Sequence, residues 1–300
     1  RDAQESRGLG DVYKRQGVLN VLLNLLFVIR FSMGVAGVAL ATSISQYLSA
    51  ALIAICLMRS ESCYRLHWDE LALHKDKALP IIRIGLPAGL QSSIFAISNV
   101  VIQSSINSFG SIAMAGSAAA ANIEGFVYVS MNSVAQASLS FASQNIGARR
   151  YERISKISRT CLLLAALFGL VLGNGVYLLH DTFLRFYSPD PAVIEAGALR
   201  LSVICTTYFL CGLMDTLACI LRAMGKSLLP MVVTIIGACG LRVLWIYTVF
   251  PLDRTFFTLF LSYPITWGVT AAVHAVCYFF TKRTMLRRAQ ASAPSEASST

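Results

Sequence analysis

Long apolar stretches separated by short basic segments dominate this sequence. Residues 84–123 include no charged side chain, Glu124 then stands alone, and residues 125–148 are uncharged again. A bilayer core requires about 20 apolar residues of helix, so this region predicts two membrane spans with one carboxylate inside the second. The same criterion predicts spans at residues 34–58, 158–179, 199–221, 228–250 and 256–281, and a short apolar helix at 17–29.

These segments predict an all-α, polytopic membrane protein with about eight transmembrane helices, the first of them incomplete. The composition agrees, because 13% of the residues are charged and 56% are hydrophobic, whereas soluble domains contain about 25% charged residues. Residues 60–79 mix leucines and Trp68 with charges, which predicts an amphipathic linker at the cytoplasmic interface. Residues 284–300 are rich in Ser and Ala and predict a disordered tail.

The first sixteen residues differ from the rest of the chain. They are polar and have no apolar centre of the kind that a signal peptide requires. Residues 11–16, DVYKRQ, can be back-translated to a sequence that resembles a transposon end used in sequencing-library preparation. We therefore expect residues 1–16 to be non-native.

The basic residues gather at alternate ends of the predicted spans. Sixteen Lys and Arg lie at 59–83, 149–159, 222–226 and 282–288, against four at the opposite ends, namely Arg30, Arg185, Arg200 and Arg254. Cytoplasmic loops of membrane proteins have an excess of Lys and Arg. The pattern predicts a cytoplasmic C-terminus and contact with membrane lipids, and it does not indicate a nucleic-acid partner for the net charge of +10.

Polar side chains in the two central spans follow helical spacing. Ser92, Asn99, Gln103 and Asn107 share one face of the first span, and Glu124, Tyr128 and Asn132 share a face of the second. Such groups avoid lipid, so they either form hydrogen bonds between helices or line a solute path. For Glu124 we favour a functional role, since an acid inside a membrane is expensive to bury.

Asp215 is the second acid inside a predicted span. It shares a helix face with Tyr208 and Arg222, but seven residues separate it from Arg222 by about 10 Å along the axis, too far for a direct pair. We expect Asp215 to bind the coupling cation and to share a low-dielectric site with Glu124. Arg242, fourteen residues into its span, either neutralises an acid or serves packing.

Motifs of enzymes and metal sites are missing from the sequence. MGKS at 224–227 lacks the glycine that a phosphate-binding loop needs at position 220, which is Ile220. The eight cysteines form no CxxC pair and the four histidines do not cluster. We therefore expect no catalytic residues, no metal site and no cofactor.

A weak internal repeat at an offset of 221 residues relates the span at 34–58 to the last span. Small residues match by chance, but both helix pairs also leave the cytoplasmic side and return to it, as in a parallel repeat. Six spans separate the related helices. A six-helix unit would then extend over 80–283, with two helices of an earlier unit at 17–59.

Several segments resemble the multidrug and toxic compound extrusion (MATE) family. They are MGVAGVALATSISQ, RIGLPAGLQSS, NIEGFVY, QNIGA and LRAMGKS, in that order. The resemblance implies a twelve-helix fold of two lobes, of which this chain has the last two helices of the first and all of the second. Many relatives have Asp near Asn24 and an acid in the span at 84–108, and both are missing here, which leaves Na⁺ or H⁺ open as the coupling ion.

The resemblance implies a monomeric antiporter of the bacterial inner membrane that exports cationic or amphipathic small molecules. Glu124 and Asp215, which correspond to acids of similar sequences, would couple the ion. The substrate cavity would be lined by Ser92, Asn99, Gln103, Tyr128, Asn132, Tyr208 and Arg242. The alternatives are a lipid-linked oligosaccharide flippase, which should line its cavity with several Arg or Lys, and a non-transporting scaffold, which has no need of buried acids.

Overall fold

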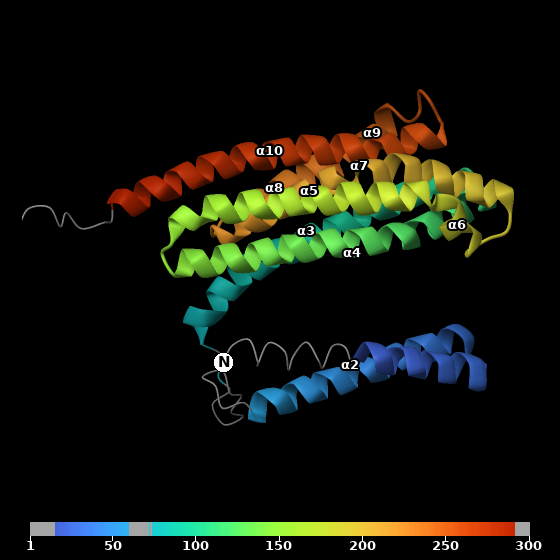
Figure 1. The fold of residues 1–300 in the computed structure, drawn as a ribbon, viewed down its shortest axis with the longest axis horizontal. Coiled ribbons are helices and arrows are strands. Elements are labelled where there is room, and N and C mark those ends of the chain that lie inside the picture. Colours follow the sequence, from blue (N-terminus) through green and yellow to red (C-terminus); the bar gives the residue numbers. More distant parts are fainter. Residues whose placement is uncertain (1–15, 60–71, 73, 292–300) are drawn as a thin grey trace, which may run out of the picture. The chain divides into compact units, whose positions relative to one another are not determined.

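The computed structural model describes residues 16–59, 72 and 74–291 (Figure 1). The chain divides near Lys75 into two compact units, which are described separately. Of residues 1–16, which we expect to be non-native, 1–15 lie outside the described part, and Gln16 is the first residue of a helix. Most of the linker predicted at 60–79 also lies outside the described part. The end of that linker, from Lys75 onward, is helical and begins α3.

The first unit is a pair of helices joined by amide and hydroxyl groups. An apolar helix runs from Gln16 to Arg30 and ends in the π-helical turn η1, Leu26–Arg30, before α2, Gly34–Arg59. The Asn20 amide nitrogen donates to Ser45 Oγ at 3.1 Å, and the Asn24 amide donates to Asn20 Oδ1 at 2.9 Å. Polar contacts of this kind hold helices together where lipid supplies no hydrophobic driving force.

The second unit is a bundle of long helices. In chain order its elements are α3 (Lys75–Asn107), α4 (Ser111–Gly147), η3 (Tyr151–Arg153), α5 (Ile154–Leu178), α6 (His180–Arg185), α7 (Pro191–Ala223), α8 (Leu228–Thr234), η4 (Ile235–Gly240), α9 (Leu241–Thr248) and α10 (Phe256–Ala291). Over the described ranges of both units, seven helices are long and apolar enough to cross a membrane, and Gln16–Arg30 is a shorter one. The predicted all-α membrane fold is confirmed.

Helix α7 lies at the centre of this bundle and packs against α4, α5 and α10. Glycines allow the closest approaches, because a Cβ at Gly169 of α5 would lie 2.5 Å from Phe209 Cα, and one at Gly116 of α4 would lie 2.5 Å from Val193 O. Such backbone contacts are common between membrane helices. The apolar core around α7 includes the buried side chains Ile102, Met131, Ile204, Met214, Phe260 and Trp267.

The span predicted at 228–250 is helical but not uniformly α-helical. A π-helical segment, Ile235–Gly240, separates α8 from α9, and Arg242 is the second residue of α9, after Leu241. π-Helical turns are rare and often mark functional sites in α-helices. The side chains of α9, which include Arg242, are therefore candidates for a functional role.

Helix α10 continues beyond the span expected at 256–281. Residues 284–291 belong to α10, although we expected a disordered tail from 284. The sequence TMLRRAQA contains mostly good helix formers, which extend the helix once the preceding span has formed.

The basic segments of the second unit lie at one end of the bundle. In Figure 1 the start of α3, the turn between α4 and α5 and the end of α10 all lie toward the left. The turn after α7 joins them, because Ser227 Oγ donates to the Arg83 carbonyl at 3.2 Å. Arg153 lies in η3, in the turn between α4 and α5, and the Arg83 carbonyl contacts the turn after α7. Arg283 lies eight residues before the end of α10, so that all three belong to the same end of the unit.

Candidate functional site

Glu124 and Arg200 form a buried ion pair between α4 and α7. Arg200 Nε donates to Glu124 Oε1 at 2.9 Å, and Nη2 donates to Oε2 at 2.8 Å. Arg200 Nη1 donates to Ser117 Oγ at 2.6 Å, and the guanidinium carbon lies 5.2 Å from the centre of the Phe260 ring. Two parallel bonds of this kind are the strongest geometry for an Arg–carboxylate pair. The charge of Glu124 is thus compensated within the protein.

Arg200, which we expected at a loop end, instead lies within a helix. Helix α7 begins at Pro191, so that Arg200 lies well inside the helix and is only 8% exposed. The missed signal is the pair Asp190–Pro191. Asp190 caps the helix by accepting a hydrogen bond from the Ala192 amide at 2.9 Å, and proline is favoured at the first helical position.

Asp215 lies further along α7 and has a different environment. It is half-buried and makes no hydrogen bond or ion pair within the described part of the chain. Tyr128 and Arg222 are close enough to interact with its charge. Arg222 itself donates from Nη2 to Gln91 Oε1 of α3 at 2.6 Å. The carboxylate of Asp215 therefore lies within electrostatic range of Arg222, a cation whose hydrogen bond goes to another helix.

The two acids do not share one site. Arg200, which binds Glu124, and Asp215 are fifteen residues apart on α7, which corresponds to about 22 Å of helix. The expected common site for Glu124 and Asp215 is therefore wrong. The spacing of residues along one span does not show which residue of a neighbouring helix a long Arg side chain reaches.

Arg242 is held between aromatic rings and neutral polar groups. It is fully buried, with its Nη1 atom 3.4 Å from Asn99 Oδ1 and its Nη2 atom 3.4 Å from Thr266 Oγ1. Its guanidinium carbon lies 4.1 Å from the ring centre of Tyr263 and 5.5 Å from that of Phe95. Cation–π contacts of this kind stabilise a desolvated cation. Among the described residues it has no carboxylate partner.

The other predicted cavity residues divide into two groups. Tyr208 is buried and packs edge-on against Trp267, with ring centres 5.4 Å apart. Ser92 donates to the Ala88 carbonyl, Gln103 to Asn107 and Gln136 to Asn132, each within a single helix. The structure thus brings Asn99 into contact with Arg242 and places Tyr128 within electrostatic range of Asp215. It leaves Ser92, Gln103 and Asn132 bonded within their own helices.

The chain is similar to known transport proteins. The family model described as MatE matches residues 87–248. A probable multidrug resistance protein NorM of Thermotoga maritima is 24% identical over 241 residues, which cover 77% of this chain and 52% of that protein. A probable multidrug resistance protein YpnP of Bacillus subtilis is 28% identical over 75% of this chain and 50% of its own length. The chain spans about half the length of these curated relatives.

Solved structures agree on the fold. The Vibrio cholerae MATE transporter VcmN in the bent form superposes with a TM-score of 0.77, at 18% identity, over 93% of this chain and 64% of that one. An outward-facing multidrug resistance MATE family transporter of the MOP superfamily gives a TM-score of 0.82, at 18% identity, over 91% of this chain and 61% of that one. At this level of identity the likeness concerns the fold alone.

Proposed function

The chain belongs to the MatE family, and from this premise we propose that it acts in an ion-coupled antiporter that exports cationic or amphipathic small molecules. The membrane would be the bacterial inner membrane, with the basic end of the second unit and the C-terminus in the cytoplasm. The relatives named as multidrug resistance proteins support this class of substrate. Na⁺ and H⁺ are both kept as candidates for the coupling ion.

The observation on which the proposal rests is the unpaired carboxylate of Asp215 in the central helix. An acid within a membrane span is costly unless it has a function or a partner. Glu124 has its partner in Arg200, whereas Asp215 makes no ion pair among the described side chains. We assign ion coupling to Asp215 and the joining of α4 to α7 to Glu124.

Exchange follows from competition for one negative charge. A proton or Na⁺ on Asp215 removes the charge that attracts a cationic substrate, so the ion and the substrate bind at each other's expense. Neutralising Asp215 also weakens its attraction for Arg222, whose guanidinium is bonded to Gln91 of α3. Occupancy of Asp215 would in this way change how strongly Arg222 links α7 to α3.

Substrate contacts are assigned to polar side chains of α3 and α4. Tyr128 is 39% exposed and is close enough to Asp215 to interact with its charge. Asn99 is exposed and bonded to Arg242, which fixes the amide with its nitrogen free. Gln103 and Asn132 offer further amides on α3 and α4. Tyr208, buried against Trp267, would support the wall rather than touch the substrate.

The test compares two Asp→Asn variants in everted membrane vesicles that contain the full-length gene product. Asp215→Asn removes the exchangeable charge and keeps the side-chain shape. Asp190→Asn is the matched control, because asparagine caps a helix about as well as aspartate. Transport of a fluorescent organic cation is followed under an imposed proton gradient and, separately, an imposed Na⁺ gradient.

We expect Asp215→Asn to lose gradient-driven transport by roughly tenfold or more, the effect of removing one strong electrostatic interaction. Equilibrium binding of the dye without a gradient should change far less, and Asp190→Asn should transport normally. The gradient that drives the unsubstituted protein identifies the ion. Normal transport by Asp215→Asn under that gradient would show that the acid is structural.

A further inference from the structure

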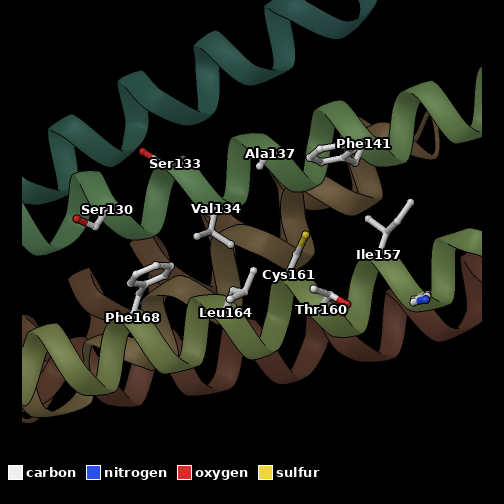
Figure 2. A pocket seen from close by; sticks show the side chains of 11 residues that line it. Ser130, Ser133, Val134, Ala137, Phe141, Ile157, Thr160, Cys161, Leu164 and Phe168 are labelled. Carbon is white, nitrogen blue, oxygen red and sulfur yellow. The ribbon is translucent and has the colours of Figure 1, made fainter. Parts of the chain in front are cut away.

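A groove runs along the bundle between α4 and α5 (Figure 2). Its volume is ≈ 670 Å³. Side chains of both helices point into it, with Phe168 at one end of the row and Phe141 and Ile157 at the other. The groove plays no part in the ion-coupling proposal, because neither Asp215 nor Tyr128 lines it.

Small and large side chains alternate along the groove. Ser133 and Ala137 of α4 and Thr160 and Cys161 of α5 are small, and Val134 and Leu164 lie between the two helices near the middle of the row. The hydroxyl of Ser133 donates to its own helix, at the Val129 carbonyl, at a distance of 2.9 Å. The rest of the wall is mainly aromatic and aliphatic. A hydrocarbon chain suits such a surface better than a polar solute does.

The length of the groove corresponds to one leaflet of a bilayer. Lys156 and Phe168, the first and last lining residues of α5, are twelve residues apart, or about 18 Å of helix. Half of the hydrocarbon core of a bilayer is about 15 Å thick. A single acyl chain therefore reaches from the Lys156 end of the groove to its far end.

The end of the groove at Lys156 is strongly basic. Residues 149–159 contain five Lys or Arg and one acid, Glu152, which gives a net charge of 5 − 1 = +4. Lys156 is exposed, and no ion pair involves this segment within the described chain. Basic clusters beside a membrane helix recognise anionic headgroups.

We propose that the groove between α4 and α5 binds one acyl chain of an anionic phospholipid, with the lipid phosphate paired to Lys156. Charge and shape select the lipid together. The basic segment attracts the headgroup, and the groove beside Ala137 and Cys161 receives the chain. Because the site does not include Asp215, a failure of the lipid-binding proposal would leave the ion-coupling proposal unaffected.

The test uses quenching of tryptophan by lipids with brominated acyl chains. The chain is reconstituted in vesicles of brominated phosphatidylglycerol or brominated phosphatidylcholine, and the signal of the unsubstituted protein is subtracted. Phe168→Trp places the probe in the groove. Leu167→Trp places it at the same depth on an exposed part of α5 outside the groove, as the matched control.

We expect Phe168→Trp to be quenched roughly twofold more by the anionic lipid, and Leu167→Trp equally by both lipids. Adding Lys156→Gln should remove the preference at position 168, whereas adding Lys226→Gln, at the turn after α7, should keep it. Equal quenching of Phe168→Trp by both lipids would overturn the proposal. The proposal would also be overturned if the preference for the anionic lipid persisted in the Lys156→Gln variant. Absence of any quenching of Phe168→Trp would overturn it too, because protein would then cover the groove.

Discussion

The guanidinium of Arg200 and the carboxylate of Glu124 pair across two helices, with side chains that are only 10% and 7% exposed. Removing one partner leaves the other charge buried without compensation, which costs about 3–5 kcal/mol. We expect Glu124→Gln and Arg200→Gln each to lower the free energy of unfolding by about this amount. The measurement is reversible denaturation of the purified protein in mixed micelles.

The exposed pair Arg185–Asp181 supplies the control for this prediction. Its atoms are 3.3 Å apart, but the side chains are 70% and 58% exposed. Arg185→Gln should therefore change the free energy of unfolding by less than about 1 kcal/mol. If Arg185→Gln and Arg200→Gln have the same effect, the buried pair does not hold α4 to α7.

A second prediction concerns two glycines of α5. Gly169→Ala places a methyl group 2.5 Å from Phe209 Cα, so the backbones of α5 and α7 must separate. Overpacking of this kind costs about 1–3 kcal/mol. Gly175→Ala meets no atom within 4 Å, and it should stabilise the helix by about 0.5–1 kcal/mol.

Thermal unfolding followed by fluorescence in detergent separates the two glycine variants. The midpoint should fall for Gly169→Ala and stay level or rise for Gly175→Ala. A rise in both would mean that α5 and α7 can separate at little cost.

The third prediction concerns the orientation of the second unit. Arg153 lies at the basic end of the bundle and Arg185 at the end of α6 on the opposite side of Figure 1. In intact cells, a membrane-impermeant maleimide should label Arg185→Cys and not Arg153→Cys, since basic segments stay in the cytoplasm. The unsubstituted protein reports the background from native cysteines.

Everted vesicles should reverse the labelling pattern of these two variants. Labelling of both variants from one side would contradict the arrangement of the bundle. Labelling of Arg153→Cys alone in intact cells would contradict only the cytoplasmic assignment of the basic end.

The sequence predicted the spans better than it predicted their ends. Long uncharged segments are sufficient to identify membrane helices, because each must satisfy its backbone internally in lipid. The span at 199–221 was placed eight residues late, since hydropathy falls around Arg200, while α7 begins at Pro191. The cost of burying that arginine is offset by a partner 76 residues earlier in the chain, which no local pattern contains.

The candidate site was only partly predictable for a related reason. The lone acids in apolar spans marked Glu124 and Asp215 as unusual, but only Glu124 has a partner among the described side chains, namely Arg200. Helix packing decides which acid a long basic side chain can reach, and the spacing along one span does not show it. The polar face of α3 was also read from spacing, but spacing could not tell Asn99, which meets Arg242, from Gln103, which bonds within its own helix.

The π-helical segment Ile235–Gly240 fixes where the positive charge of Arg242 lies. A π-turn accommodates one more residue than an α-turn, and each residue of an α-helix turns the chain by about 100°. In an uninterrupted α-helix, Leu241 would take the direction that Arg242 now has, toward Thr266 and Asn99. A helical wheel drawn across the whole span therefore misplaces the cation by one position, and the aromatic rings of Tyr263 and Phe95 would face an uncharged side chain.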